Sequence, residues 1–155
     1  MTSAHRPNTK PVAVAAGRLW AGGLATALIA ALTAVVGVLI TTGILDLEVL
    51  APPGFTNSEA ANYAIAAAVA ALLATALIHL LIVSTPRPFA YFRWIMGLLI
   101  LAATLIPFAS SSALSTKVAT GAINLVVGIA IASLTSGTAS RVVGQAGRAP
   151  GVDLT

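Results

Sequence analysis

The sequence predicts an all-α membrane protein, a transmembrane four-helix bundle with up-down-up-down topology. Hydrophobic residues make up 58% of the 155 residues and charged residues only 8%, whereas soluble domains carry about a quarter charged residues. Four apolar segments are each long enough to cross a hydrocarbon core about 30 Å thick. None of them alternates between polar and apolar residues as the strands of a membrane barrel do. Helices therefore fit best, because they satisfy every backbone hydrogen bond inside lipid.

The predicted spans divide the chain into one domain and two tails. The first apolar run is much longer than the core of a secretory signal, so we read it as an uncleaved span. The tails, 1–17 and 144–155, are rich in Gly, Pro and small polar residues and are predicted to be flexible. The domain between them, 18–143, holds the four spans, at about 19–45, 60–83, 89–109 and 118–136.

The connection between the first two spans carries helix-breaking and helix-starting residues. After the first span, Pro52, Pro53 and Gly54 interrupt the chain. Thr56, followed three residues later by Glu59, has the form of a capping box that opens the second helix.

The next two connections are short. The second, STPRPF, makes the second and third spans an antiparallel hairpin, and Pro88 suits the first turn of the third helix. The third, FASSSALSTK, follows Pro107.

The distribution of basic residues predicts the orientation in the membrane. Positively charged loops stay in the cytoplasm, and an even number of spans places both termini on one side. That side carries seven of the eight basic residues, and the other carries Lys117 with three acidic residues. Both termini are therefore predicted to be cytoplasmic.

A cluster of arginines and aromatic residues marks the predicted cytoplasmic end of the bundle. Amphipathic aromatic side chains favour the headgroup level, so Trp20 and the aromatic residues of the third helix (Phe89, Tyr91, Phe92 and Trp94) read as membrane anchors. Long arginine side chains reach the interface in the same way. Besides anchoring, the arginines could bind the headgroup of an anionic lipid; they are Arg18, Arg87, Arg93 and Arg141.

His79 is the one ionisable side chain well inside a predicted span. Such a residue is a functional candidate by default, although a neutral histidine that finds a hydrogen-bond partner can be purely structural. By depth, Thr26 on the first span and Ser133 or Thr135 on the fourth lie at its level. We expect an inner polar tier made of these residues, serving either packing or ligand binding.

Asn124 is the second polar candidate inside the bundle. It belongs to a series of small or polar residues spaced by four on the fourth span, namely Thr120, Asn124, Gly128, Ala132 and Ser136. Thr104 lies at about the same depth as Asn124. The second span has a similar stripe, namely Ala67, Ala71, Thr75 and His79. Small stripes let helices approach closely, so the second and fourth helices are predicted to pack together; the alternative is a homo-oligomer contact on the fourth helix.

Several classes of function find no support in the residues. The chain has no cysteine, which excludes thiol chemistry, and His5 in the tail is the only other histidine, so no metal site is predicted. No catalytic set can be assembled at one depth, no cofactor motif is present, and no span contains the carboxylate that small multidrug exporters use. The basic residues stand singly among apolar segments, which does not fit nucleic-acid binding.

Several stretches together resemble a family of small actinobacterial integral membrane proteins, known only as a domain of unknown function. They are WAGGLATALIAAL, LLATALIHLLIVSTPRPFAYFRWI, the PF that ends the third span and KVATGAINLVVGIAIASL, set among spans rich in Ala, Val, Leu and Gly. The resemblance covers residues 18–143. It implies a four-helix architecture and a bacterial inner membrane, and it brings no functional residue.

Two hypotheses of function follow. In the first, the chain is a non-enzymatic accessory or scaffold protein that binds another membrane protein, or itself, through helix packing in the bilayer. In the second, it is a small carrier or ligand-binding protein for an apolar or anionic molecule, using the polar tier around His79. The accessory protein should tolerate His79→Ala, and the carrier should not.

Overall fold

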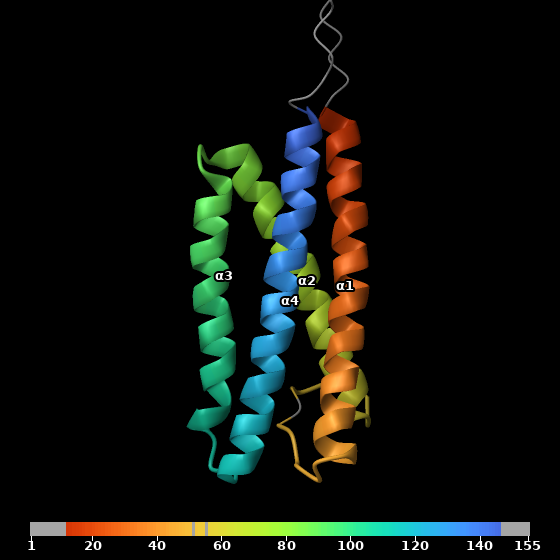
Figure 1. Cartoon of the computed structure of the whole chain (residues 1–155), viewed down its shortest axis with the longest axis vertical. Helices are drawn as coiled ribbons and strands as arrows, with labels where there is room; N and C mark the ends of the chain where they lie inside the picture. Colours follow the sequence, from red (N-terminus) through yellow and green to blue (C-terminus); the bar gives the residue numbers. More distant parts are fainter. Residues whose placement is uncertain (1–11, 51, 55, 147–155) are drawn as a thin grey trace, which may run out of the picture.

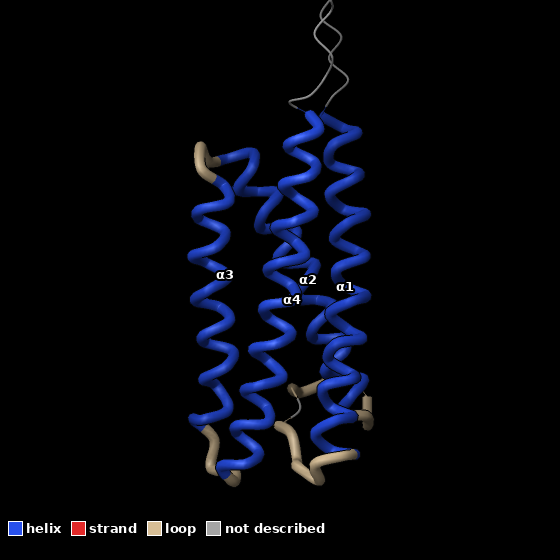
Figure 2. The backbone as a smooth tube through the Cα atoms, viewed as in Figure 1, coloured by secondary structure: helices blue, strands red, loops and turns tan. Residues whose placement is uncertain are grey.

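Four long helices make up almost all of the described chain (Figures 1 and 2). The structure is a computed structural model that describes residues 12–50, 52–54 and 56–146. Within these residues it is all-helical and contains no strand, which confirms the predicted all-α class with four membrane-length helices. The elements are α1 (Val12–Gly43), α2 (Glu59–Ser84), α3 (Pro88–Leu105), a 3₁₀ turn, η1 (Ile106–Ala109), and α4 (Leu114–Ala146).

The starts of α2 and α3 test the helix-start signals predicted from the sequence. α2 is capped by Ser58, whose hydroxyl accepts a hydrogen bond from the Ala61 N–H at 3.3 Å. The predicted capping box was therefore wrong by two residues, because Thr56 instead binds the side chain of Asn62. Pro88 at the first position of α3 is confirmed, since its missing N–H costs nothing there.

Two helices are longer than the spans predicted from lipid thickness. α1 begins at Val12, so residues 12–17 are helical rather than part of a flexible tail, and α4 runs from Leu114 to Ala146. Neither extension contains a proline, so the helical hydrogen bonds can continue past the predicted spans. Residues 1–11 and 147–155 of the predicted tails lie outside the described part.

The helices alternate in direction through the bundle. Figure 1 shows α1 and α3 running one way and α2 and α4 the other, so that α1 starts and α4 ends at the same end as the α2–α3 connection. We call this the basic end, because Arg18 near the start of α1, Arg87 before α3 and Arg141 near the end of α4 belong to it. α1 packs along α2 and α4, whereas α3 packs on α4 and meets α2 mainly near the basic end.

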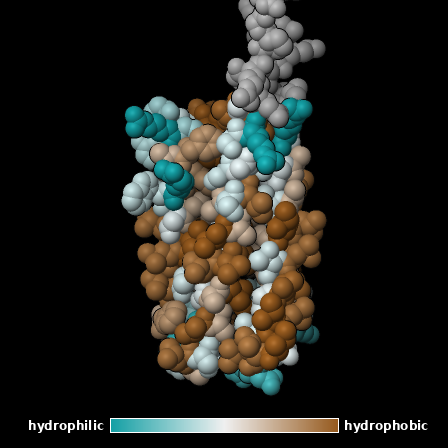
Figure 3. Space-filling model, viewed as in Figure 1, coloured by the Kyte–Doolittle hydropathy of each residue, from teal (hydrophilic) through white to brown (hydrophobic). Residues whose placement is uncertain are grey.

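Small residues fill the centre of the bundle. Ala30, Ala34, Ala71 and Ala139 are fully buried, and larger side chains such as Ile78 fill the layers between them. Because lipid is as apolar as leucine, close van der Waals packing between small residues holds membrane helices together. The outward side chains of all four helices are large and apolar, and Figure 3 shows that hydrophilic residues gather at the two ends of the visible face.

The connection between α1 and α2 folds back onto the bundle. Its first part, residues 44–50, is called the strap. Asp46 adopts a left-handed backbone conformation with φ of 49°, which Asp tolerates better than most residues. The Leu47 N–H donates to the Thr41 carbonyl at 2.9 Å, and Val49 is buried in the core. The strap thus supplies a fifth packing element at the end opposite the basic end.

Candidate functional site

His79 is bound by an aromatic side chain of the neighbouring helix. Trp20 Nε1–H on α1 donates to His79 Nδ1 on α2 over 3.3 Å, and the two rings meet edge to face at 79° with centroids 6.3 Å apart. Nδ1 is the acceptor in this bond. The bond ties α1 to α2 near the basic end, which is a packing role for the one histidine inside a span.

The predicted polar tier does not form as a hydrogen-bonded group. Thr26 is buried and donates to the Gly22 carbonyl of its own helix, and Ser133 is exposed and donates to the Ala130 carbonyl. Thr135 is buried, and its hydroxyl has no hydrogen-bond partner in the described structure. Threonine and serine in a helix readily bond back to carbonyls three or four residues earlier. His79 also lies nearer the basic end than Thr26, since it bonds to Trp20 while Gly23 already faces Thr75.

Asn124 joins α4 to α3 rather than to α2. Its Nδ2–H donates to the Ala103 carbonyl at 2.8 Å, while Thr104 donates to the Ile100 carbonyl within its own helix. The backbones are close at the same level, since a Cβ added at Gly121 would lie 3.1 Å from the Thr104 carbonyl oxygen. The middle of the small-residue stripe of α4, at Asn124 and Gly128, therefore packs on α3 inside one chain. An asparagine whose amide bonds across a helix pair stabilises it by about 0.6–2 kcal/mol.

The small-residue stripe of α2 packs against α1. Ala67, Ala71 and Thr75 are buried, and a Cβ added at Gly23 of α1 would lie 2.5 Å from Thr75 Cγ2. Helices α2 and α4 do contact each other, as predicted, but at Thr75 the α2 stripe lies against α1 rather than against the α4 stripe. The strap contributes to this arrangement, because Leu50 lies between α2 and α4. The Leu50 carbonyl accepts a hydrogen bond from Tyr63 of α2, and the Leu50 N–H donates to the Thr120 hydroxyl of α4.

All four candidate arginines are exposed. Arg18 and Arg141 lie near the start of α1 and the end of α4, Arg87 caps α3, and Arg93 lies in its second turn. The helix ends and turns that carry them all belong to the basic end of the bundle (Figure 1), where a headgroup would sit.

The aromatic residues beside the arginines divide into two groups. Tyr91 and Trp94 are exposed, as interfacial anchors should be, but Phe92 is fully buried. The reading of Phe92 as an anchor was wrong. Phe92 and Met96 are the two buried residues of α3 and lie four apart on one helix face, so Phe92 is a core residue that holds α3 to the bundle.

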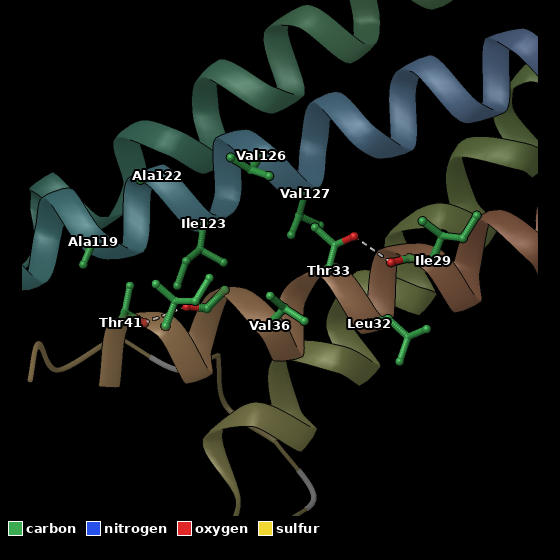
Figure 4. A pocket seen from close by; sticks show the side chains of 12 residues that line it. Ile29, Leu32, Thr33, Val36, Thr41, Ala119, Ala122, Ile123, Val126 and Val127 are labelled. Carbon is green, nitrogen blue, oxygen red and sulfur yellow. Dashed lines mark hydrogen bonds between the residues drawn. The ribbon is translucent and has the colours of Figure 1, made fainter. Parts of the chain in front are cut away.

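A groove runs between α1 and α4 in the half of the bundle nearer the strap (Figure 4). Its volume is about 510 Å³, within the range of about 300–1,000 Å³ typical of ligand sites. None of its lining residues is charged, and the hydroxyls of Thr33 and Thr41 donate to carbonyls of α1 itself. The lining is Ile29, Leu32, Thr33, Val36, Gly37, Ile40 and Thr41 from α1, with Ala119, Ala122, Ile123, Val126 and Val127 from α4.

A second groove, of about 340 Å³, lies beside α2 and includes Pro53, Gly54 and Asn62. Neither groove includes His79. Within the described ranges, no three His, Cys, Asp or Glu residues come together as metal ligands would.

The family model for a family of unknown function (DUF6069) matches residues 14–154. The chain belongs to this family. No curated protein and no solved structure matches the chain. Membership in DUF6069 agrees with the resemblance found in the sequence and assigns no activity to any residue, so the candidate sites of this DUF6069 chain rest on geometry.

Sequence reasoning missed Trp20 as the partner of His79 and missed the strap. The strap had a signal: in the stretch DLEVL, acidic residues alternate with Leu47 and with Val49, which is buried. Alternation of polar and apolar residues predicts an extended segment with one buried side, whereas the acidic residues alone suggest a solvated connector.

Proposed function

We propose that the chain is a four-span protein of the bacterial inner membrane, of actinobacterial type, with both termini in the cytoplasm. The charge distribution supports this orientation. The four candidate arginines gather at the basic end, while Lys117, Asp46, Glu48 and Glu59 belong to the other end, and positive charge favours the cytoplasmic side.

Labelling of an introduced cysteine tests the orientation. Asn57 is exposed in the connection that follows the strap, and the natural chain has no cysteine to interfere. In intact cells, Asn57→Cys is expected to react fully with a membrane-impermeant maleimide, because its loop faces outward. A cysteine at Ser140, exposed near the basic end, is the matched control and should react only after lysis. The reverse pattern would overturn the orientation.

For the activity, we propose an accessory or scaffold role in which the chain binds another membrane protein through helix packing, without catalysis. The observation that carries this is the exposed face of α3, of whose 18 residues only Phe92 and Met96 are buried. An apolar helix face that its own bundle leaves open can pack against a partner helix in the bilayer. A carrier that binds its ligand through polar side chains is less well supported, because His79, Asn124 and Thr26 already form hydrogen bonds within the bundle.

Gentle detergent extraction followed by mass spectrometry tests the scaffold role. We expect a membrane protein to stay bound to the parent chain and to His79→Ala, because the histidine only ties α1 to α2. The double change Leu98→Ala and Leu105→Ala, on the exposed face of α3, should release the partner. Retention of a small molecule that is lost in His79→Ala would contradict the scaffold and favour the carrier for an apolar or anionic molecule.

The arginines support a second, narrower proposal that anionic lipid is retained at the basic end. Four exposed arginines lie on helices at that end, and basic residues at the cytoplasmic leaflet attract anionic headgroups. In the same mass spectra, Arg87→Gln with Arg93→Gln should retain less anionic lipid than the parent chain. Unchanged retention would leave the arginines with an anchoring role only.

A further inference from the structure

The groove between α1 and α4 has a specific depth in the membrane. Its residues on α1, from Ile29 to Thr41, lie in the half of the span nearer the strap, and its residues on α4, from Ala119 to Val127, lie in the same half. At 1.5 Å per residue, the α1 wall is about 18 Å long. One leaflet of the hydrocarbon core is about 15 Å thick, half of about 30 Å. The groove therefore extends over one leaflet and not over the whole membrane.

Packing on either side limits the groove. Toward the basic end, α1 and α4 touch closely, since a Cβ added at Gly22 would overlap Thr138. The floor is formed where Gly37 meets Ile123, with 3.3 Å from an added Cβ to Ile123 Cγ1. At the strap end, the Thr41 carbonyl accepts a hydrogen bond from the Leu47 N–H of the strap. The groove thus ends where the strap is tied down, at the level where headgroups begin.

The charge and polarity of the lining select the occupant. None of the lining residues is charged, and the hydroxyl groups of Thr33 and Thr41 are satisfied by α1 carbonyls, so a charged or hydrogen-bonding molecule would lose its own partners on entry. For a helix of another protein the groove offers contact over only its strap-side half, because α1 and α4 close on each other at Gly22 and Thr138 toward the basic end.

We propose that this groove is a binding site for one acyl chain of a phospholipid in the leaflet on the strap side. The proposal requires that the four helices span a membrane and does not depend on the scaffold role. The acyl chain would lie along Val36 and Val126, with its ester end beside the strap and its methyl end near Ile29.

Photo-crosslinking in vesicles tests the site. The full chain is reconstituted in dioleoylphosphatidylcholine containing a trace of phosphatidylcholine with a diazirine on one acyl chain, and crosslinked residues are mapped by mass spectrometry. We expect the yield on groove residues to exceed that on Leu101, which is equally apolar, exposed on α3 and outside the groove. Ala122→Phe, at an exposed position in the lining, should abolish that excess because the ring occupies the space of the acyl chain.

Two controls separate occupancy from loss of fold. Leu101→Phe should leave the groove yield unchanged, and Val126→Phe, a second filling change at an exposed lining position, should reproduce the loss seen with Ala122→Phe. Equal yields on the groove and on Leu101 in the parent chain would overturn the proposal, as would an excess that survives both filling changes. A groove yield that falls as the protein-to-lipid ratio in the vesicles rises would overturn it too and identify a second copy of the chain as the occupant. None of these outcomes depends on whether a partner protein co-purifies.

Discussion

Gly23→Leu is expected to lower the thermal unfolding midpoint of the detergent-solubilised chain strongly. A Cβ at Gly23 would lie 2.5 Å from Cγ2 and 2.7 Å from Oγ1 of Thr75. Thr75 is fully buried, β-branched, and bonded through its hydroxyl to the Ala71 carbonyl, so it cannot turn away. Extra methylenes in a packed core cost about 1–3 kcal/mol, occasionally more, and leucine must push α1 away from α2.

A matched glycine and a double mutant isolate the cause. Gly97 on α3 is exposed, and nothing lies within 4 Å of a Cβ added there, so Gly97→Leu should not lower the midpoint. The double variant Gly23→Ala with Thr75→Ala should lose less stability than the sum of the losses in the two single variants, because removing Cγ2 and Oγ1 makes room for the new methyl group. If Gly97→Leu is as harmful as Gly23→Leu, the contact with Thr75 is not what makes Gly23 necessary.

The fold was predictable because its main signals are local and strong. Apolar runs longer than a membrane is thick need lipid around them, and Pro86, Pro88 and Pro107 lie at or near helix ends as expected. The outer ends of the first and last helices were less predictable. α1 and α4 continue beyond the predicted spans, since membrane thickness sets the minimum length of a helix and does not end it.

The packing partners were not predictable from spacing alone. A stripe of small residues shows that one helix face is smooth but not which neighbour it meets, so the α2 and α4 stripes were paired with each other and in fact meet α1 and α3. Depth counting failed for His79 for a similar reason. Thr26 and Ser133, which were predicted at its level, bond to their own helices, and Trp20, assigned to the interface, is the donor to His79.

Phe92 shows where helical periodicity outweighs residue type. Its aromatic neighbours suggested an interfacial belt, yet Phe89, Phe92 and Met96 recur at the spacing of one helix face. Phe92 and Met96 are buried, and Phe89 packs against the core. Tyr91 and Trp94 point away from that face and are exposed. The same stretch therefore anchors α3 in two directions, toward the headgroups and into the bundle.

Phe92→Ala is accordingly expected to destabilise the bundle by about 3–5 kcal/mol, the usual cost of removing a buried phenyl group, and to release α3 from α4 and α2. The measurement is again the unfolding midpoint in detergent, with Trp94→Ala as the control because that ring is 76% exposed and loses contacts with detergent alone. A cavity of phenyl size lined by apolar side chains binds benzene, so saturating benzene should restore part of the loss in Phe92→Ala and none elsewhere. Equal losses in the two variants, with no rescue, would place Phe92 at the interface after all.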